Sequence, residues 1–194
     1  MRQRFTAAER WVHRLTGLLM LVCIATAAIL YNGSLSLRVG HRHAIELIHV
    51  YCGFALPVPM LAGLVSVAYR ADLSRLNRFS AEDWAWLRST ARRRARDGVG
   101  KFNAGQKLNS WLSCAAILVL LGTGTIMNFT GWSPLSWRTG ATFVHDWVAL
   151  AIGLLVLGHI YRAVNDPEAR RGMRTGAVSA DWAQAEHPAW APPD

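Results

Sequence analysis

Four of the seven histidines lie in or at the edge of apolar stretches of the sequence: His13, His49, His145 and His159. An ionisable side chain at membrane depth is a functional candidate by default, although a single histidine there can also serve only as a hydrogen-bond partner for a neighbouring helix. His145 and His159 are fourteen residues apart. In a helix this is about 21 Å along the axis and returns the side chain to within roughly 40° of the same direction. One helix is therefore expected to present two imidazoles at two depths.

The elements that must position these histidines are four long apolar segments with few charges. Each approaches the ~20 residues that cross a ~30 Å hydrocarbon core. Charged residues make up 17% of the chain, below the roughly 25% of soluble domains, and hydrophobic residues make up 52%. The first segment is no signal peptide, because three more follow it. The sequence predicts an all-α integral membrane protein, a four-transmembrane-helix bundle with spans at 13–31, 44–69, 108–129 and 143–163.

The basic residues predict the orientation of these spans. Eighteen of the 21 Lys and Arg residues lie in the N-terminal flank, in the connection 70–107 or after the fourth span. Positive residues favour the cytoplasmic side, so both termini are expected in the cytoplasm. The formal net charge of +9 is then explained by the orientation of the spans, and it does not indicate a nucleic-acid partner. The predicted organisation is a membrane domain over 1–175 and an irregular cytoplasmic tail over 176–194.

The connection 70–107 carries two further signals. Ser80 followed by Asp83 resembles the start of a helix with its capping residue. The basic run Arg92–Arg94 suits contact with lipid phosphates, or less readily a docking surface for a partner protein.

With this orientation the four histidines form two pairs matched in depth. His13 and His159 lie at the cytoplasmic side, and His49 and His145 lie at the outer side. Two imidazoles from different helices suit the axial positions of a haem iron, whereas zinc or copper would favour three or four clustered ligands.

Small and basic residues near the pairs fit this interpretation. Gly17 and Gly53 each follow a candidate ligand by four residues, one helical turn later, where a side chain would collide with a flat macrocycle; close helix packing is the alternative reason for either glycine alone. Arginines near the pairs are candidates to neutralise haem propionates or are simply interface anchors. These are Arg10, Arg14 and Arg162 for the inner pair, and Arg38 and Arg42 for the outer pair.

Several motifs resemble the gamma subunit of respiratory formate dehydrogenase, a diheme b-type cytochrome, over nearly the whole chain. The most specific is GKFNAGQKLNSW at 100–111, followed by LIHVYCGF at 47–54 and by the His145/His159 pair ending in HIY. The tail segment DWAQAEHPAW at 181–190 is also similar, although it has only His187 where the family has adjacent histidines.

The resemblance implies ligand and substrate sites. It places the outer haem on His49 and His145 and the inner haem on His13 and His159, the same pairing that topology predicts. It also implies a quinone site (menaquinone or ubiquinone) near the inner haem, formed by Asn103, Gly105, Gln106 and His159. From the residues alone, Asn103 and Gln106 can equally be a helix cap and a solvated face, and Lys101 and Lys107 can be interface charges.

The function implied by the resemblance is electron transfer in a bacterial inner membrane. A catalytic molybdenum or tungsten (alpha) subunit would oxidise formate, and an iron–sulfur (beta) subunit would pass electrons to the outer haem, the inner haem and then quinone. The chain itself carries no formate-oxidising site. One alternative is the same diheme cytochrome serving a NiFe-hydrogenase or another periplasmic oxidoreductase. The other is a haem-free membrane anchor or small transporter whose histidines form relays.

Overall fold

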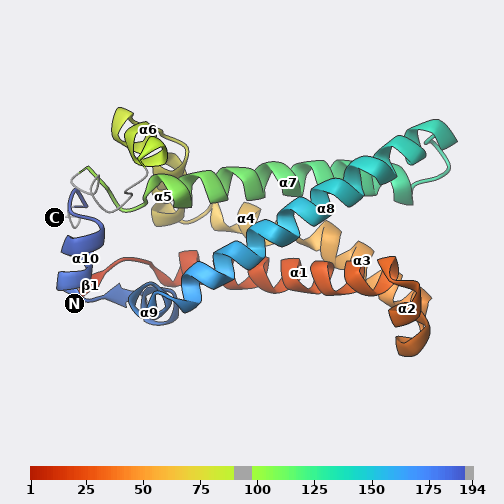
Figure 1. Cartoon of the computed structure of the whole chain (residues 1–194), viewed down its shortest axis with the longest axis horizontal. Helices are drawn as coiled ribbons and strands as arrows, with labels where there is room; N and C mark the ends of the chain where they lie inside the picture. The colour runs from red at the N-terminus through yellow and green to blue at the C-terminus, as the bar shows by residue number, and fades with distance from the viewer. Residues whose placement is uncertain (90–97, 191–194) are drawn as a thin grey trace. The chain divides into compact units, whose positions relative to one another are not determined.

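The computed structural model describes residues 1–89 and 98–190, and the basic run Arg92–Arg94 lies outside the described residues. Four helical spans are long and apolar enough to cross a membrane. They are α1 (Ala7–Tyr31), α3 and α4 together (Arg42–Ala55 and Val58–Gly63), α7 (Ala104–Asn128) and α8 (Leu135–Val164) (Figure 1). The remaining elements are α2 (Gly33–Val39), α5 (Val67–Leu76), α6 (Ala81–Arg88), α9 (Pro167–Thr175), α10 (Ala180–Glu186), β1 (Arg2–Gln3) and β2 (Ala177–Val178).

The surfaces of the four spans are those of a membrane protein. Between 6% and 17% of the most apolar window of each span is buried inside the protein. Large apolar side chains such as Leu18, Leu118 and Leu154 are about 60% exposed. Helices that remain apolar on their outward faces need lipid around them, because water would make such surfaces aggregate. The all-α membrane fold predicted from the sequence is confirmed.

The second span is shorter than the sequence predicts, since it ends at Gly63 and not at Tyr69. Pro57 stands between α3 and α4, where its missing N–H and ring prevent a regular continuation. Ser66 then accepts a hydrogen bond from the backbone N–H of Tyr69 at 3.4 Å and caps the separate helix α5. Residues after Gly63 therefore belong to a turn and to the next helix.

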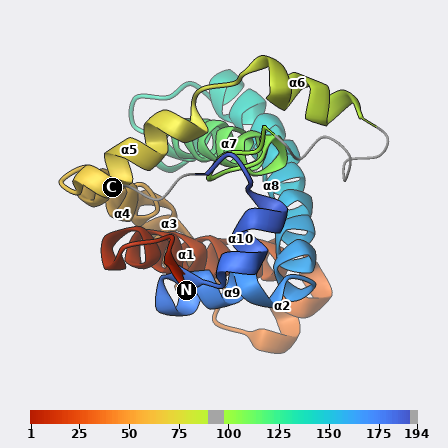
Figure 2. The ribbon, with the colours of Figure 1, turned by 90° about the vertical axis from the view of Figure 1, so that its left-hand side faces the viewer.

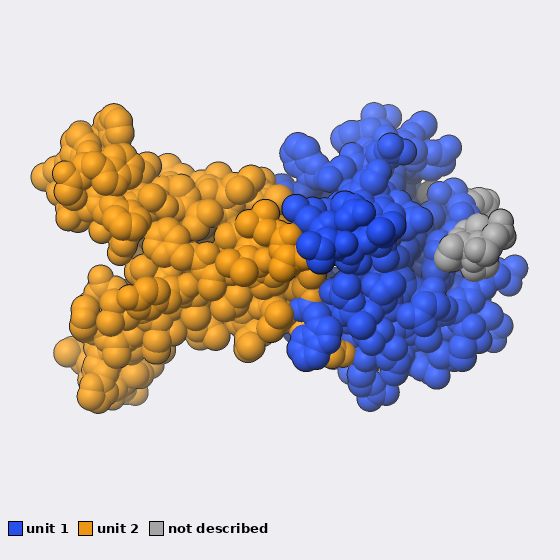
Figure 3. Space-filling view, turned by 180° about the vertical axis from the view of Figure 1, so that it is seen from behind, with its two compact units in different colours: residues 1–11, 63–113, 156–194 blue, residues 12–62, 114–155 orange. Residues whose placement is uncertain are grey.

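The chain divides into two compact units (Figure 3). Unit 1 comprises residues 1–11, 63–113 and 156–194, and unit 2 comprises residues 12–62 and 114–155. In unit 2 the connection after α1 is helical: Asn32 caps α2 by accepting from the Leu35 N–H at 3.0 Å. Gly40 and His41 follow with positive φ angles of 67° and 52° and reverse the chain into α3.

Unit 1 orders the C-terminal tail, which the sequence analysis wrongly expected to be irregular. Strands β1 and β2 pair antiparallel, and α10 lies beside the N-terminal segment (Figure 2). Ser179 caps α10 by accepting from the Trp182 N–H at 3.3 Å, and Val178, Ala183 and Trp190 form a small buried core. These apolar residues are scattered among Ala and Pro, which is why composition alone concealed the folded tail.

Candidate functional site

His49 of α3 and His145 of α8 come together inside unit 2. Their ring centroids are 6.3 Å apart and the ring planes meet at 66°. Two imidazoles bound through nitrogens about 2 Å from one iron have centroids roughly 6 Å apart. Among residues 1–89 and 98–190, no group of three or more His, Cys, Asp or Glu gathers as a metal cluster would require. The donor set here is thus a pair of imidazoles, which fits haem.

Two threonines that the sequence analysis missed hold the rings. Thr26 Oγ1 lies 2.9 Å from His49 Nδ1, and Thr123 Oγ1 lies 2.9 Å from His145 Nδ1. Neither threonine belongs to a motif named in the sequence analysis, and each contact joins residues more than twenty positions apart in the chain. Only the fold brings them to the histidines.

Glycines leave open space where the sequence analysis expects a planar group to pack. A Cβ atom added to Gly17 or to Gly53 would meet no atom within 4 Å outside its own helix. Gly124 of α7 differs from these two glycines, because a Cβ there would contact the imidazole, at 3.5 Å from His145 Cε1. The spaces beside Gly17 and Gly53 are compatible with haem packing.

The inner pair is not tested by this geometry. His13 belongs to unit 2 and His159 belongs to unit 1, so their pairing stays a prediction.

Two of the candidate propionate arginines already bind backbone carbonyls. Arg42 donates from Nη1 to the Leu30 carbonyl at 3.0 Å and to Ser36 Oγ at 3.3 Å. Arg10 donates from Nη1 to the Phe5 carbonyl at 3.1 Å. The other three, Arg14, Arg38 and Arg162, have exposed side chains.

Asn103 and Gln106 form a reciprocal cap at the start of α7. The Gln106 N–H donates to Asn103 Oδ1 at 2.9 Å, and the Asn103 N–H donates to Gln106 Oε1 at 3.0 Å. This is the capping role that the sequence analysis weighed against quinone binding. The cap engages only the amide oxygens, so each NH2 group remains a potential donor to a carbonyl.

Gly105 and Lys107 attach α6 to the start of α7. A Cβ on Gly105 would lie 3.1 Å from Cη2 of Trp86, so only glycine admits this ring without a shift. Lys107 Nζ donates to Asp83 Oδ2 at 2.5 Å, and Ser80 caps α6 with the predicted partner Asp83. Lys107 is therefore a structural ion-pair partner and not merely an interface charge.

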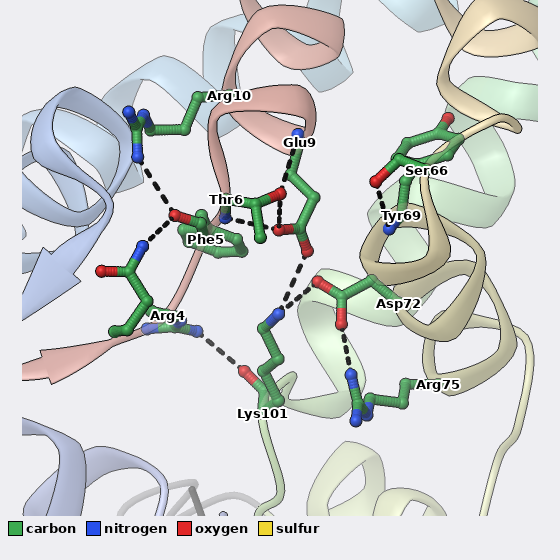
Figure 4. A network of polar contacts seen from close by, with 11 residues as sticks. Arg4, Phe5, Thr6, Glu9, Arg10, Ser66, Tyr69, Asp72, Arg75 and Lys101 are labelled. Carbon is green, nitrogen blue, oxygen red and sulfur yellow. Dashed lines mark hydrogen bonds and ion pairs between the residues drawn. The ribbon is translucent and has the colours of Figure 1, made fainter. Parts of the chain in front are cut away.

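Lys101 lies at the centre of a second feature absent from the sequence analysis, a buried ion cluster in unit 1 (Figure 4). Its Nζ contacts Glu9 Oε1 at 3.2 Å and also Asp72 Oδ2, while Arg75 donates to Asp72 Oδ1 at 2.7 Å. Burial, with a further contribution from a hydrogen bond to the Glu9 carboxyl, raises the pKa of Asp72 to about 6, although Lys101 opposes this shift. The cluster ties α1, α5 and the segment before α7 together.

Arg4 extends the same cluster toward the tail. It donates from Nη2 to the Lys101 carbonyl at 2.8 Å, and its guanidinium lies 4.7 Å from the Trp182 ring centroid. Desolvation lowers the pKa of Arg4 to about 10. His187 also links the tail to the segment before α7, because its Nδ1 lies 2.7 Å from the Gly100 carbonyl.

The chain is similar to known proteins over most of its length. The sequence model of a family described as prokaryotic cytochrome b561 matches residues 4–175. The cytochrome b556(Fdn) subunit of nitrate-inducible formate dehydrogenase from Escherichia coli is 35% identical over 95 residues, covering 47% of this chain and 44% of that protein. The match thus spans less than half the length of that relative. The cytochrome b556(fdo) subunit of Escherichia coli formate dehydrogenase is 24% identical over 196 residues, covering 96% of this chain and 90% of that protein. The formate dehydrogenase cytochrome b556 subunit of Haemophilus influenzae is 34% identical over 94 residues, covering 47% of this chain and 40% of that protein.

Proposed function

The chain belongs to the prokaryotic cytochrome b561 family, and from this premise we propose that it is the membrane anchor and electron-transfer subunit of a formate dehydrogenase. Membership implies b-type haem and a multi-pass position in a bacterial inner membrane. In the proposal, electrons pass from a periplasmic iron–sulfur subunit through two b haems to quinone near the cytoplasmic face. A separate molybdenum or tungsten subunit oxidises the formate.

The observation that carries the proposal is the His49–His145 pair. Two helices far apart in the sequence place the ring centroids of these imidazoles 6.3 Å apart. A threonine hydroxyl contacts Nδ1 of each ring and orients it. These two imidazoles would hold a haem iron that supplies one-electron transfer and leaves no open position for a substrate. The residues of the chain supply ligation, spacing and a low-polarity surrounding.

The second haem is proposed on His13 and His159. His159 follows His145 by fourteen residues of the same helix α8, or about 21 Å along its axis. Haems held at these two depths of one helix would carry electrons across most of the hydrocarbon core.

Quinone reduction is proposed at the start of α7. The NH2 groups of Asn103 and Gln106 are suited to donate hydrogen bonds to a quinone carbonyl, because the cap occupies only the amide oxygens. Gly105 lies between them, and His159 is the haem ligand proposed to adjoin this site. Reduction takes up two electrons and two protons, and the basic residues of this side support proton uptake from the cytoplasm.

Formate-driven haem reduction tests the proposed function. When the chain is purified with its native partners, anaerobic addition of formate is expected to produce the b-type absorption bands of reduced haem, and added quinone is expected to reoxidise them. Haem that is reduced by dithionite and by hydrogen, but not by formate, would assign the chain to a hydrogenase or another donor. Absence of haem bands even with dithionite would favour the haem-free anchor.

A further inference from the structure

The same contact occurs twice at the outer histidine pair, on two different pairs of helices. Thr26 of α1 reaches His49 of α3, and Thr123 of α7 reaches His145 of α8. Both distances between Oγ1 and Nδ1 are 2.9 Å, and all four residues lie in unit 2. Thr26 is buried and Thr123 is half-buried, so bulk water does not compete freely for these bonds.

The tautomer of each ring decides the direction of its bond to threonine, and the other contact of the hydroxyl favours one direction. A threonine hydroxyl has one hydrogen to donate. Thr26 Oγ1 lies 2.7 Å from the Val22 carbonyl of the preceding turn, and Thr123 Oγ1 lies 2.7 Å from the Val119 carbonyl. Backbone carbonyls only accept, and these contacts are shorter than those to the histidines, so we assign each hydroxyl hydrogen to the carbonyl of its own helix.

The threonine oxygen must therefore accept from the imidazole. Nδ1 carries the ring hydrogen in both histidines, because an unprotonated Nδ1 would set two lone pairs against each other. In a neutral imidazole this leaves the lone pair on Nε2. Both rings are thus held in the tautomer that binds a metal through Nε2.

We propose that Thr26 and Thr123 are positioning residues that orient the two axial ligands of the outer haem and make their imidazoles more electron-donating. This inference rests on the proposed haem function. A chain of carbonyl, hydroxyl and imidazole polarises in one direction, so partial negative charge accumulates on the ring. Such a ligand stabilises ferric iron over ferrous iron, which lowers the reduction potential of the outer haem.

A purely structural role would also explain hydrogen bonds between membrane helices, since such bonds modestly stabilise helix association. The two roles differ in what they change. Helix association affects the stability of the protein, whereas polarisation of a ligand affects the potential and the electronic spectrum of one haem.

The test uses Thr123→Val and Thr26→Val in the intact complex, with Thr123→Ser as the conservative variant. Thr125→Val is the matched control: Thr125 also donates to its own helix, at 2.7 Å to the Leu121 carbonyl, but within the described part of the chain it forms no hydrogen bond to a histidine. Spectroelectrochemical titration is expected to show a higher potential for the outer haem in each Val variant, with up to about a tenfold change in its ferric-to-ferrous equilibrium. Haem retention is expected to weaken on the order of tenfold.

The ferric EPR signal of the outer haem is expected to shift in both Val variants, and Thr123→Ser is expected to restore the wild-type potential and signal. If the Val variants match Thr125→Val in potential and EPR signal, the inference is wrong, even where their thermal stability falls. The inference would also be wrong if the potential and EPR signal of the inner haem alone shifted. The inner haem is identified as the one that remains after removal of His145. Failure of the proposed function itself would look different, because the wild-type protein would then contain no haem, or its haem would be reduced by dithionite but not by formate.

Discussion

His145→Ala is expected to reduce the haem content of the purified protein from two b haems per chain to about one. The imidazole is one of the two proposed axial ligands, and its partner His49 cannot alone hold a low-spin bis-histidine iron. The inner haem should remain, because its proposed ligands His13 and His159 are predicted at the other depth. The measurement is pyridine haemochrome quantification against protein concentration, together with the EPR spectrum of the remaining ferric haem.

His43→Ala is the matched control for this experiment. His43 lies in the first turn of the same helix α3 that carries His49, and it is exposed. It is expected to keep both haems. Loss of both haems in a well-folded His145→Ala protein, or loss of the outer haem in His43→Ala, would contradict the assignment of His49 and His145 as a ligand pair.

Lys101→Met is expected to destabilise the protein by about 3–5 kcal/mol, the usual result of removing one member of a buried ionic group. The Lys101 side chain is 9% exposed, and those of Glu9 and Asp72 are 6% and 5% exposed. Without the cation, two buried carboxylates would face each other with little water to solvate them. The measurement is the midpoint of thermal unfolding in detergent, which is expected to fall by several degrees.

The Lys101→Met defect is expected to depend on pH. Burial already raises the pKa of Asp72 to about 6, and loss of Lys101 removes a charge that opposes this rise. As pH falls toward 5, the carboxyl takes up a proton and the unpaired charge disappears. The destabilisation should thus be largest above pH 7 and should shrink in acid.

Two further variants show whether charge imbalance is the cause. Adding Asp72→Asn to Lys101→Met removes one of the unpaired carboxylates and is expected to restore part of the lost stability. Arg75→Met alters a partner of Asp72 whose side chain is 56% exposed, so it should cost no more than about 1 kcal/mol. An Arg75→Met defect as large as that of Lys101→Met would show that the cluster does not act as described.

The spans and helix caps could be predicted because their signals are local. Uninterrupted apolar runs indicate the four membrane helices, and the Ser80–Asp83 spacing correctly predicts the start of α6. The end of the second span was misplaced for a local reason too. Ser66 caps α5 from within an apolar run, and a single capping residue does not interrupt the hydropathy that predicts a span.

The missed residues depend on contacts between distant parts of the chain. Lys101 meets Glu9 across 92 positions, so no spacing rule distinguishes it from the other basic residues of its loop. The same holds for Thr26 and Thr123, which resemble any membrane-helix threonine until their histidine partners are known. Orientation and depth could pair the histidines, but they could not identify the groups that orient the rings.

The central claim is that two pairs of histidines bind two b haems in one chain. Its most direct test is haem quantification on the purified wild-type protein, with protein concentration determined by amino-acid analysis. The account predicts two non-covalent b haems per chain. One haem would contradict the inner pair of His13 and His159, and no haem would contradict the claim as a whole.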